Sequence, residues 1–380
     1  MILDYESLKI IWWLFIGVLL IGFAITDGFD MGVGALIPFV GRNDEERRVL
    51  INAIGPTWES NQVWLITAGG ALFAAWPMVY ATAFSGFYFA IFLALFCLFL
   101  RPVGFDYRSK LENPGWRKAW DFGLCIGGVG PALVFGIAFG NLLQGVPFHF
   151  DDDLRVYYTG SFWGLLNPFA LLSGVVSLSM LVMHGCVYLQ MKTEGTIAER
   201  CRKVLLISCM VFLSSYAIAG IVIACGLDGY RIVSIGDPNR VLSPLAKHVA
   251  LASGAWMDNY EHFEWLWILP VLVFGLTLTT GFLSRRNRAG TAFITSALVL
   301  CGVIITTGFS MYPFLMPSSS HPNHSLTIWD SSSSLLTLKV MFWITIFFLP
   351  IVIGYTSWVY RVLKGKITLA NIRENQHSVY

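Results

Sequence analysis

Apolar stretches of roughly 20 residues recur along the whole sequence, and a helix needs about that length to cross the hydrocarbon core of a membrane. Of the 380 residues, 56% are hydrophobic and 13% are charged, whereas ordinary soluble domains contain about 25% charged residues. The sequence therefore predicts an all-α fold, a polytopic bundle of transmembrane helices.

We expect a single integral membrane domain, residues 1–380, with no separate soluble domain. About nine spans are predicted: 8–38, 50–75, 78–100, 119–141, 163–190, 204–226, 262–283, 290–312 and 336–362. The segment before the first span is acidic, and no small-residue cleavage site follows a short apolar core. A cleavable signal peptide is therefore not expected.

The basic residues alternate between the predicted connections, which orients the bundle. Of the 25 Lys and Arg residues, 19 fall in alternate connections and in the C-terminal segment: Arg42, Arg47, Arg48, Arg101, Arg108, Lys110, Arg117, Lys118, Lys192, Arg200, Arg202, Lys203, Arg285, Arg286, Arg288, Arg361, Lys364, Lys366 and Arg373. Because cytoplasmic loops carry an excess of Lys and Arg, we expect the C-terminus in the cytoplasm and the N-terminus in the periplasm.

Two aspartates, Asp27 and Asp30, interrupt the first apolar stretch, and from Ile10 to Gly41 no other Asp, Glu, Lys or Arg occurs. A charge near the centre of a bilayer costs at least ~2.5–3.5 kcal/mol, so such residues usually face a bundle interior or a hydrated path. Three residues apart on a helix, the two carboxylates share a face.

Glu59 is a third candidate acid. Asp30 lies 12 residues from Arg42, or ~18 Å along a helix, and Glu59 lies 11 residues from Arg48, or ~16 Å. Two antiparallel neighbouring helices would therefore place the two acids at similar depth. Amides and a hydroxyl lie beside Glu59 in the segment 58–64, and acids in such surroundings are typical of a proton relay.

A structural interpretation of these acids stays open. The first span could end near Asp27, with residues 31–41 in the membrane interface, so that the aspartates cap and anchor the helix. Glu59 would then serve as a hydrogen-bond partner between helices. For the segment 101–108, Arg101 and its neighbours could be interfacial anchors. Alternatively, Arg101 pairs with an intramembrane acid and Asp106 begins a proton path.

The histidines and cysteines do not predict a haem or metal site. Only His184 lies well inside an apolar stretch, whereas several haems would need several axial His or Met ligands at depth. The seven cysteines contain no C-x-x-C pair and are expected to be packing residues. His321 and His324 are separated by Pro322, which prevents a regular helical face, so no metal site is expected.

Several long blocks of the sequence closely resemble subunit II of the cytochrome bd ubiquinol oxidase family. The blocks cover nearly the whole chain and are spaced as in that family: 11–13, 26–32, 61–77, 84–88, 101–108, 139–147, 316–319 and 377–380. The resemblance implies nine transmembrane helices in the bacterial inner membrane and a partner, the haem-bearing subunit I, with small single-span accessory subunits in some complexes. The complex oxidises quinol and reduces dioxygen to water with protons from the cytoplasm, which contributes to the proton-motive force.

The same resemblance assigns roles to individual positions. Haem b and haem d are expected mainly in subunit I, and some family members hold a ubiquinone or menaquinone structurally within subunit II. Proton supply is expected to involve Asp30 with Asp27, Glu59 and Arg101. Three further positions match family sites, with Asp106 and Tyr380 near a cytoplasmic proton opening at the subunit interface and Trp64 beside a dioxygen path. The family varies between Asp and Glu at position 59, which leaves the relay geometry there open.

The sequence leaves two other function classes to compare with the oxidase interpretation. A proton-coupled secondary transporter would need a midplane substrate site with broken helices in two matching halves, and the second half shows no break to match that near Gly32, Gly34 and Pro38. A purely structural scaffold would make the buried acids dispensable. In the oxidase interpretation this chain carries no catalytic residue and is inactive without its partner.

Overall fold

The computed structural model describes residues 4–368, 370 and 372. In this part of the chain the α-helices are α1 (Tyr5–Val40), α2 (Asp44–Ile54), α3 (Trp58–Ala75), α4 (Pro77–Gly86), α5 (Tyr88–Tyr107), α6 (Pro114–Gln144), α7 (Pro168–Lys192), α8 (Gly195–Cys225), α9 (Asp258–His262), α10 (Ile268–Arg285), α11 (Ala289–Met311) and α12 (Leu335–Val362). Short 3₁₀ helices are η1 (Arg108–Lys110), η2 (Trp163–Leu165), η3 (Ala255–Met257), η4 (Glu264–Trp267) and η5 (Pro322–His324).

Polar side chains at the first residues fix where the long helices begin. Asp4 accepts a hydrogen bond from the backbone of Ser7 at the start of α1, and Asn43 caps α2 in the same way. Asn167 and Ser334 cap α7 and α12. Such caps satisfy backbone N–H groups that have no partner inside the helix, and each stabilises its helix by about 1 kcal/mol.

Eight helices in the described residues are long and apolar enough to cross a membrane, namely α1, α5 with η1, α6, α7, α8, α10 with η4, α11 and α12. The predicted all-α polytopic bundle is confirmed. Two predicted spans are divided in the structure. The predicted span 78–100 is divided at Phe87, between α4 and α5, and the predicted span 50–75 is divided at residues 55–57. Pro56 lacks a backbone N–H and Gly55 precedes it, so α2 ends at Ile54 and α3 begins at Trp58.

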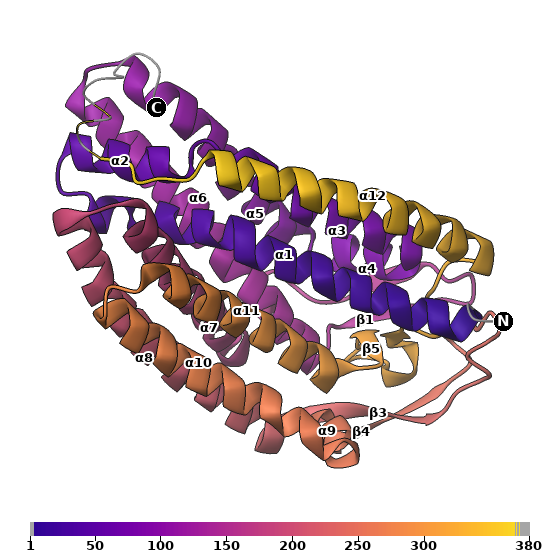
Figure 1. The fold of residues 1–380 in the computed structure, drawn as a ribbon. Helices are drawn as coiled ribbons and strands as arrows, with labels where there is room; N and C mark the ends of the chain where they lie inside the picture. Colours follow the sequence, from indigo (N-terminus) through magenta and orange to yellow (C-terminus); the bar gives the residue numbers. More distant parts are fainter. Residues whose placement is uncertain (1–3, 369, 371, 373–380) are drawn as a thin grey trace.

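The helix α1 runs through the middle of the bundle and packs against α3, α6, α7 and α11 (Figure 1). Its close approach to α7 depends on Gly32, where a Cβ atom would collide with the backbone of Leu181 and Gly185. Small residues at such seams are typical of helix packing in membranes, because they let two backbones approach closely.

Short β-hairpins lie at one end of the bundle, near the start of α1 (Figure 1). The strands are β1 (Phe148–Phe150), β2 (Val156–Tyr158), β3 (Asp228–Ser234), β4 (His248–Ser253), β5 (Phe314–Met316) and β6 (Leu326–Thr327), paired antiparallel as β1–β2, β3–β4 and β5–β6. We call this the hairpin end and the opposite one the α2 end. The connections from α5 to α6, α7 to α8 and α10 to α11 lie at the α2 end.

One side of the bundle exposes a broad aromatic surface formed by α3, α5 and α12. The helix α12 lies along α1 and α3 (Figure 1). Only 6% of its most apolar stretch of 18 residues is buried. Phe347 and Phe96 are 66% and 58% exposed. This surface, defined as the exposed side chains of α3, α5 and α12, must be covered by lipid or by another protein chain.

Candidate functional site

The first buried charge cluster joins α1 to α5. Asp27 and Asp30 lie one turn apart on α1 and are 0% and 1% exposed. Arg101, near the end of α5, donates two hydrogen bonds to Asp27, from Nη1 to Oδ2 at 2.9 Å and from Nη2 to Oδ1 at 2.6 Å. The same Nη2 is 4.0 Å from Oδ2 of Asp30. One guanidinium group therefore serves two carboxylates.

The fold brings Arg101 to these acids past the surface of α6. A Cβ atom at Gly127 of α6 would lie 2.8 Å from Cγ of Arg101, so the arginine side chain needs a glycine there to pass. The guanidinium group then lies 5.6 Å from the centre of the Trp58 ring, which stacks on Phe105 at 5.2 Å. These aromatic rings exclude water on one side and strengthen the electrostatic interactions within the cluster.

A chain of hydrogen bonds connects the second aspartate to α3 and α12. Nδ2 of Asn61 donates to Oδ2 of Asp30 at 2.8 Å, and Oη of Tyr360 donates to Oδ1 of Asn61 at 2.6 Å. Asn61 is buried and Tyr360 is half-buried. Oδ1 of Asp30 has no hydrogen-bond partner among the described residues. We call Asp27, Asp30, Asn61, Arg101 and Tyr360 the acid cluster.

The charge balance of the acid cluster determines what it can do chemically. With both aspartates ionised, the two carboxylates and one guanidinium group carry a net charge of minus one in a place from which water is largely excluded. A buried net charge is costly, and binding one proton removes it. Because Arg101 holds Asp27 with two charge-assisted hydrogen bonds, Asp30 is the carboxylate better placed to take that proton.

The other predicted site residues lie outside the acid cluster. Glu59 and Asp106 are exposed. Trp64 is half-buried and packs over Gly22 of α1, where a Cβ atom would lie 2.6 Å from its ring. Tyr380 lies outside the described residues. The structure thus brings together Asp27, Asp30 and Arg101 but does not add Glu59 to them.

Two members of the acid cluster were missed from the sequence. Asn61 belongs to the polar segment beside Glu59. Counting residues from the helix ends gave the correct depth for this segment relative to Asp30, but not which side of α3 faces Asp30. Asn61 is two positions from Glu59, about 200° around the helix, so one faces Asp30 when the other faces away. Tyr360 lies 299 residues from Asn61, within a strongly apolar helix, and no local signal marks it.

His184 is buried on α7, and both of its ring nitrogens already have protein partners. Nδ1 lies 2.8 Å from Oγ of Ser296, and Nε2 lies 3.0 Å from the backbone oxygen of Ile25. The imidazole stacks on Phe293 with ring centres 4.6 Å apart. Within residues 4–368, 370 and 372, no group of three His, Cys, Asp or Glu residues is arranged to hold a metal ion.

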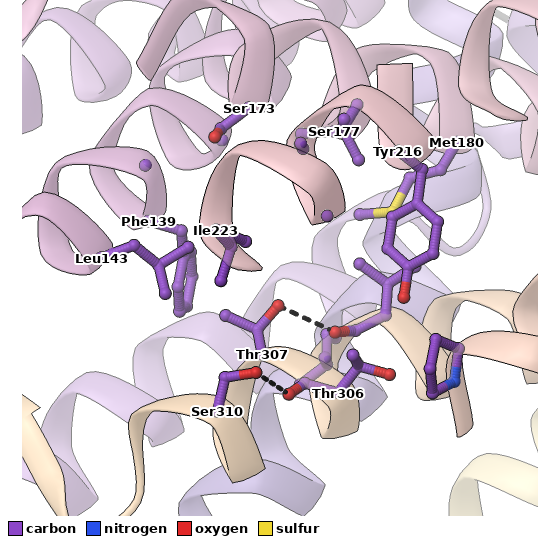
Figure 2. Close-up of a pocket in the computed structure, with 18 of the residues that line it drawn as sticks. Phe139, Leu143, Ser173, Ser177, Met180, Tyr216, Ile223, Thr306, Thr307 and Ser310 are labelled. Atoms are coloured by element: carbon purple, nitrogen blue, oxygen red, sulfur yellow. Dashed lines mark hydrogen bonds between the residues drawn. The ribbon is translucent and has the colours of Figure 1, made fainter. Parts of the chain in front are cut away.

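A large apolar cavity of about 600 Å³ lies between α1, α6, α7, α8, α10 and α11 (Figure 2). Most hydroxyl groups on its lining donate to the backbone of their own helices, as Thr307 does to Val303 and Ser310 to Thr306. Oη of Tyr216 lies near Thr306 but makes no hydrogen bond to a described residue. The cavity is therefore shaped for an apolar molecule with a polar group.

Comparison with known proteins identifies the family. The model of the family "Cytochrome bd terminal oxidase subunit II" matches residues 8–363. The chain belongs to this family. It is 54% identical over the full length of both chains to cytochrome bd-I ubiquinol oxidase subunit 2 of Escherichia coli K12, and equally to a probable cytochrome oxidase subunit 2 of Haemophilus influenzae. Its identity to cytochrome bd ubiquinol oxidase subunit 2 of Bacillus subtilis is 32%, covering 95% of this chain and 97% of the relative.

The fold of this subunit II chain also matches a solved structure. A chain in the bd oxidase structure from Geobacillus thermodenitrificans aligns with a TM-score of 0.64, covering 94% of this chain and all of that one at 18% identity. Family membership makes the protein a multi-pass subunit of a terminal oxidase complex in the bacterial inner membrane, with haem in the complex and a subunit I as partner. A secondary transporter is thereby set aside.

Proposed function

We propose that this subunit II chain supplies protons for the reduction of dioxygen to water and stabilises a haem-bearing subunit I. Proton uptake from the cytoplasm would let the complex contribute to the proton-motive force. The observation that carries the proposal is the pair of buried aspartates that share the single guanidinium group of Arg101. The acid cluster can hold one proton inside the membrane, because binding that proton removes its net negative charge.

The proposed path begins at the α2 end. The basic connections at that end favour a cytoplasmic location, which would leave the hairpin end in the periplasm. Asp106 is exposed beyond the cluster, between Phe105 and Tyr107, and is placed to collect protons from water. We assign Tyr360 and Asn61 to holding Asp30 in position, since an amide orients a carboxylate but is a poor proton carrier.

Glu59 is proposed as the group that passes protons toward the partner. It is exposed at the start of α3, beside the exposed Ser60. A carboxylate and a hydroxyl facing lipid would be costly, so this part of the aromatic surface is better suited to a protein partner than to hydrocarbon. We infer that subunit I covers α3, α5 and α12 there. Trp64 remains the proposed neighbour of a dioxygen path.

The proton proposal is tested by replacing each acid separately in the complete oxidase. Asp30→Asn is expected to lower both quinol-driven oxygen consumption and proton uptake in proteoliposomes by at least tenfold, and Glu59→Gln to lower both substantially. Glu264→Gln, an exposed acid at the hairpin end, is the matched control and should leave both rates unchanged. Parent-like rates in Asp30→Asn would remove the acid cluster from the mechanism.

We further propose that haem b and haem d are held mainly by subunit I. The support from this chain is that His184, its one histidine deep in an apolar helix, already uses both ring nitrogens. An axial ligand needs a free nitrogen or sulfur directed at the iron. The absorbance spectrum of the chain purified alone, compared with the co-expressed complex, tests this, and haem bands from the lone chain would overturn it.

The apolar cavity is the proposed place for a structurally bound ubiquinone or menaquinone. Its size and apolar lining fit an isoprenoid chain, and Tyr216 offers a hydroxyl group to a quinone oxygen. Gly220 lines the cavity and has open space where a Cβ would lie, so Gly220→Leu should fill it. We expect this variant to lower the quinone extracted per complex. Gly275→Leu, also with open space but outside the cavity, should retain it.

A further inference from the structure

A second, smaller cavity of about 210 Å³ lies at the α2 end, between the α1–α2 connection and the start of α6. Its lining is mainly charged and comprises Arg42, Asn43, Asp44, Arg47, Glu112, Pro114, Arg117, Lys118 and Asp121. None of these residues belongs to the acid cluster. We call this cavity the basic cavity, and the proposed proton path does not account for its charges.

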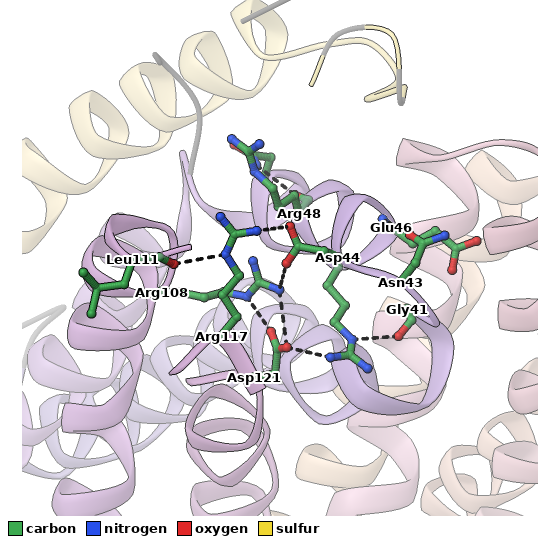
Figure 3. A network of polar contacts seen from close by, with 11 residues as sticks. Gly41, Asn43, Asp44, Glu46, Arg48, Arg108, Leu111, Arg117 and Asp121 are labelled. Carbon is green, nitrogen blue, oxygen red and sulfur yellow. Dashed lines mark hydrogen bonds and ion pairs between the residues drawn. The ribbon is translucent and has the colours of Figure 1, made fainter. Parts of the chain in front are cut away.

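The walls of the basic cavity are held by ion pairs (Figure 3). Asp121 binds both Arg47, at 2.8 Å, and the buried Arg108, at 2.5 Å. Asp44 likewise binds Arg108, at 2.9 Å, and Arg117, at 2.8 Å. Each of these two aspartates is thus shared by two guanidinium groups, so their negative charges are already neutralised.

The arginines on the walls are also fixed by backbone carbonyls. Nε of Arg47 donates to the oxygen of Gly41 at 2.9 Å, and Nε of Arg117 donates to the oxygen of Leu111 at 3.2 Å. Each arginine retains an Nη2 group with no hydrogen bond to a described residue. Donors that are held in place before binding lose little conformational entropy when an anion arrives.

The remaining cations make the cavity positive. Arg42 and Lys118 are exposed, and neither forms an ion pair with any residue that the structure describes. If Arg108, which binds both lining aspartates, is included, the cavity has five cationic side chains and three carboxylates. This is a formal surplus of two positive charges. Nη1 of Arg108, which is 1% exposed, has no hydrogen-bond partner among the described residues, although its Nη2 binds both lining aspartates.

Exposed apolar side chains lie close in sequence to the lining residues of the basic cavity. Phe39, three residues before Arg42, is 72% exposed, and Phe122, directly after Asp121, is 62% exposed. Leu111 is 50% exposed, and Trp116 and Trp120 pack edge to face at the start of α6. Exposed aromatic and aliphatic side chains beside basic residues are typical of the membrane–water interface. A charged group bound here would lie at headgroup depth, with hydrocarbon next to it.

We propose that the basic cavity binds the phosphate group of an anionic phospholipid headgroup, with the acyl chains lying beside Phe39 and Phe122. A phospholipid headgroup and free phosphate share the same chemistry, a phosphate oxyanion that guanidinium and ammonium groups can bind. Basic pockets between transmembrane helices bind lipid headgroups in this way. The site is independent of the proton proposal, because none of its residues carries a proton in that scheme.

The test uses the complete oxidase, delipidated in detergent and titrated with phosphatidylglycerol, with bound lipid counted by native mass spectrometry. The variant is Arg42→Gln/Lys118→Gln, which removes the two cations that form no ion pair with a described residue and so leaves the walls intact. The matched control is Arg285→Gln/Arg288→Gln, which removes two exposed arginines at the same end, one at the end of α10 and one in the connection to α11. A charge-conserving variant, Arg42→Lys/Lys118→Arg, tests whether charge alone is needed.

We expect parent, control and charge-conserving variant to retain one tightly bound phosphatidylglycerol. The double glutamine variant should bind it roughly 30-fold more weakly, since each Lys or Arg near an anionic lipid contributes about fivefold in affinity. Equal binding by parent and double glutamine variant would overturn the site. Equal binding of phosphatidylethanolamine would overturn its preference for anionic lipid. Displacement of the lipid by inorganic phosphate would make free phosphate the ligand and overturn the lipid assignment.

Discussion

Removing Arg101 should destabilise the bundle mainly through the charge that it leaves behind on Asp27. In Arg101→Leu, Asp27 loses two hydrogen bonds of 2.9 and 2.6 Å while remaining 0% exposed. Breaking a buried ion pair by removing one partner costs about 3–5 kcal/mol, because the remaining charge has no compensation. We therefore expect the free energy of unfolding to fall by that amount.

Replacing Asp27, alone and together with Arg101, separates this charge effect from lost packing. In Asp27→Leu, Arg101 keeps a carboxylate at 4.0 Å, that of Asp30, so the loss should be smaller, about 1–3 kcal/mol. The double variant Arg101→Leu/Asp27→Leu removes both charges, and Asp30 can then be protonated and bonded to Asn61. Because replacing a whole buried pair by apolar residues is often neutral, the double variant should be more stable than Arg101→Leu alone.

The assay is unfolding of the purified complex in mixed micelles, followed by far-ultraviolet circular dichroism. The three variants and the parent form a double-mutant cycle, and the expected coupling is at least about 2 kcal/mol, in the upper part of the ~0.5–3 kcal/mol range for residues in contact. Arg285→Leu, an exposed arginine, controls for loss of a positive charge and should change stability by less than about 0.5 kcal/mol. Additive losses would refute the shared-charge reasoning.

Three further predictions follow from other contacts. Tyr360→Phe removes the 2.6 Å hydrogen bond to Asn61, so it should cost about 1 kcal/mol in unfolding assays and slow proton uptake without changing KM for quinol; unchanged uptake would exclude Tyr360 as a positioning residue. The hydrogen bond from Arg200 holds the pKa of Glu46 below its ordinary 4.5, so its stabilisation is present above pH 4.5 and lost as the pH falls further. Glu46→Gln should therefore be less stable than the parent at pH 7, with the gap closing in acid, and a gap independent of pH would contradict this. Gly32→Leu should prevent assembly because its side chain meets the α7 backbone, whereas Gly275→Leu on α10, with open space, should assemble normally by size-exclusion chromatography.

The membrane-spanning helices and the two buried aspartates could be predicted because both depend on local composition. An apolar stretch of about 20 residues has few alternatives to a spanning helix, and a charge within it must face the bundle interior. Residue counting also gave the depth at which α1 and α3 meet. Pairing between Arg101 and an intramembrane acid was one of the two interpretations of that segment, and the structure contains it.

The side of α3 that faces Asp30 could not be predicted. The depth of a residue in the membrane can be estimated by counting residues from the end of its helix. The direction in which its side chain faces depends on the exact residue at which the helix begins. The break at residues 55–57 separates α2 from α3, so the direction of the second predicted span cannot be extended from residue 50. The role of Tyr360 could not be predicted for a different reason. Its contact with Asn61 depends only on how α12 packs on α1 and α3.

A comparison of the buried charges within the described residues shows why Asp30 is the proton-binding candidate. Lys247 lies 2.9 Å from Asp330, one cation for one anion, and Lys9 donates to three backbone oxygens. Asp121 has two guanidinium partners, and Glu46 has Arg200. Each of these sites is balanced by charge or by hydrogen bonds. At Asp30 the nearest cation is 4.0 Å away and is already bonded to Asp27, so only a proton can complete the balance.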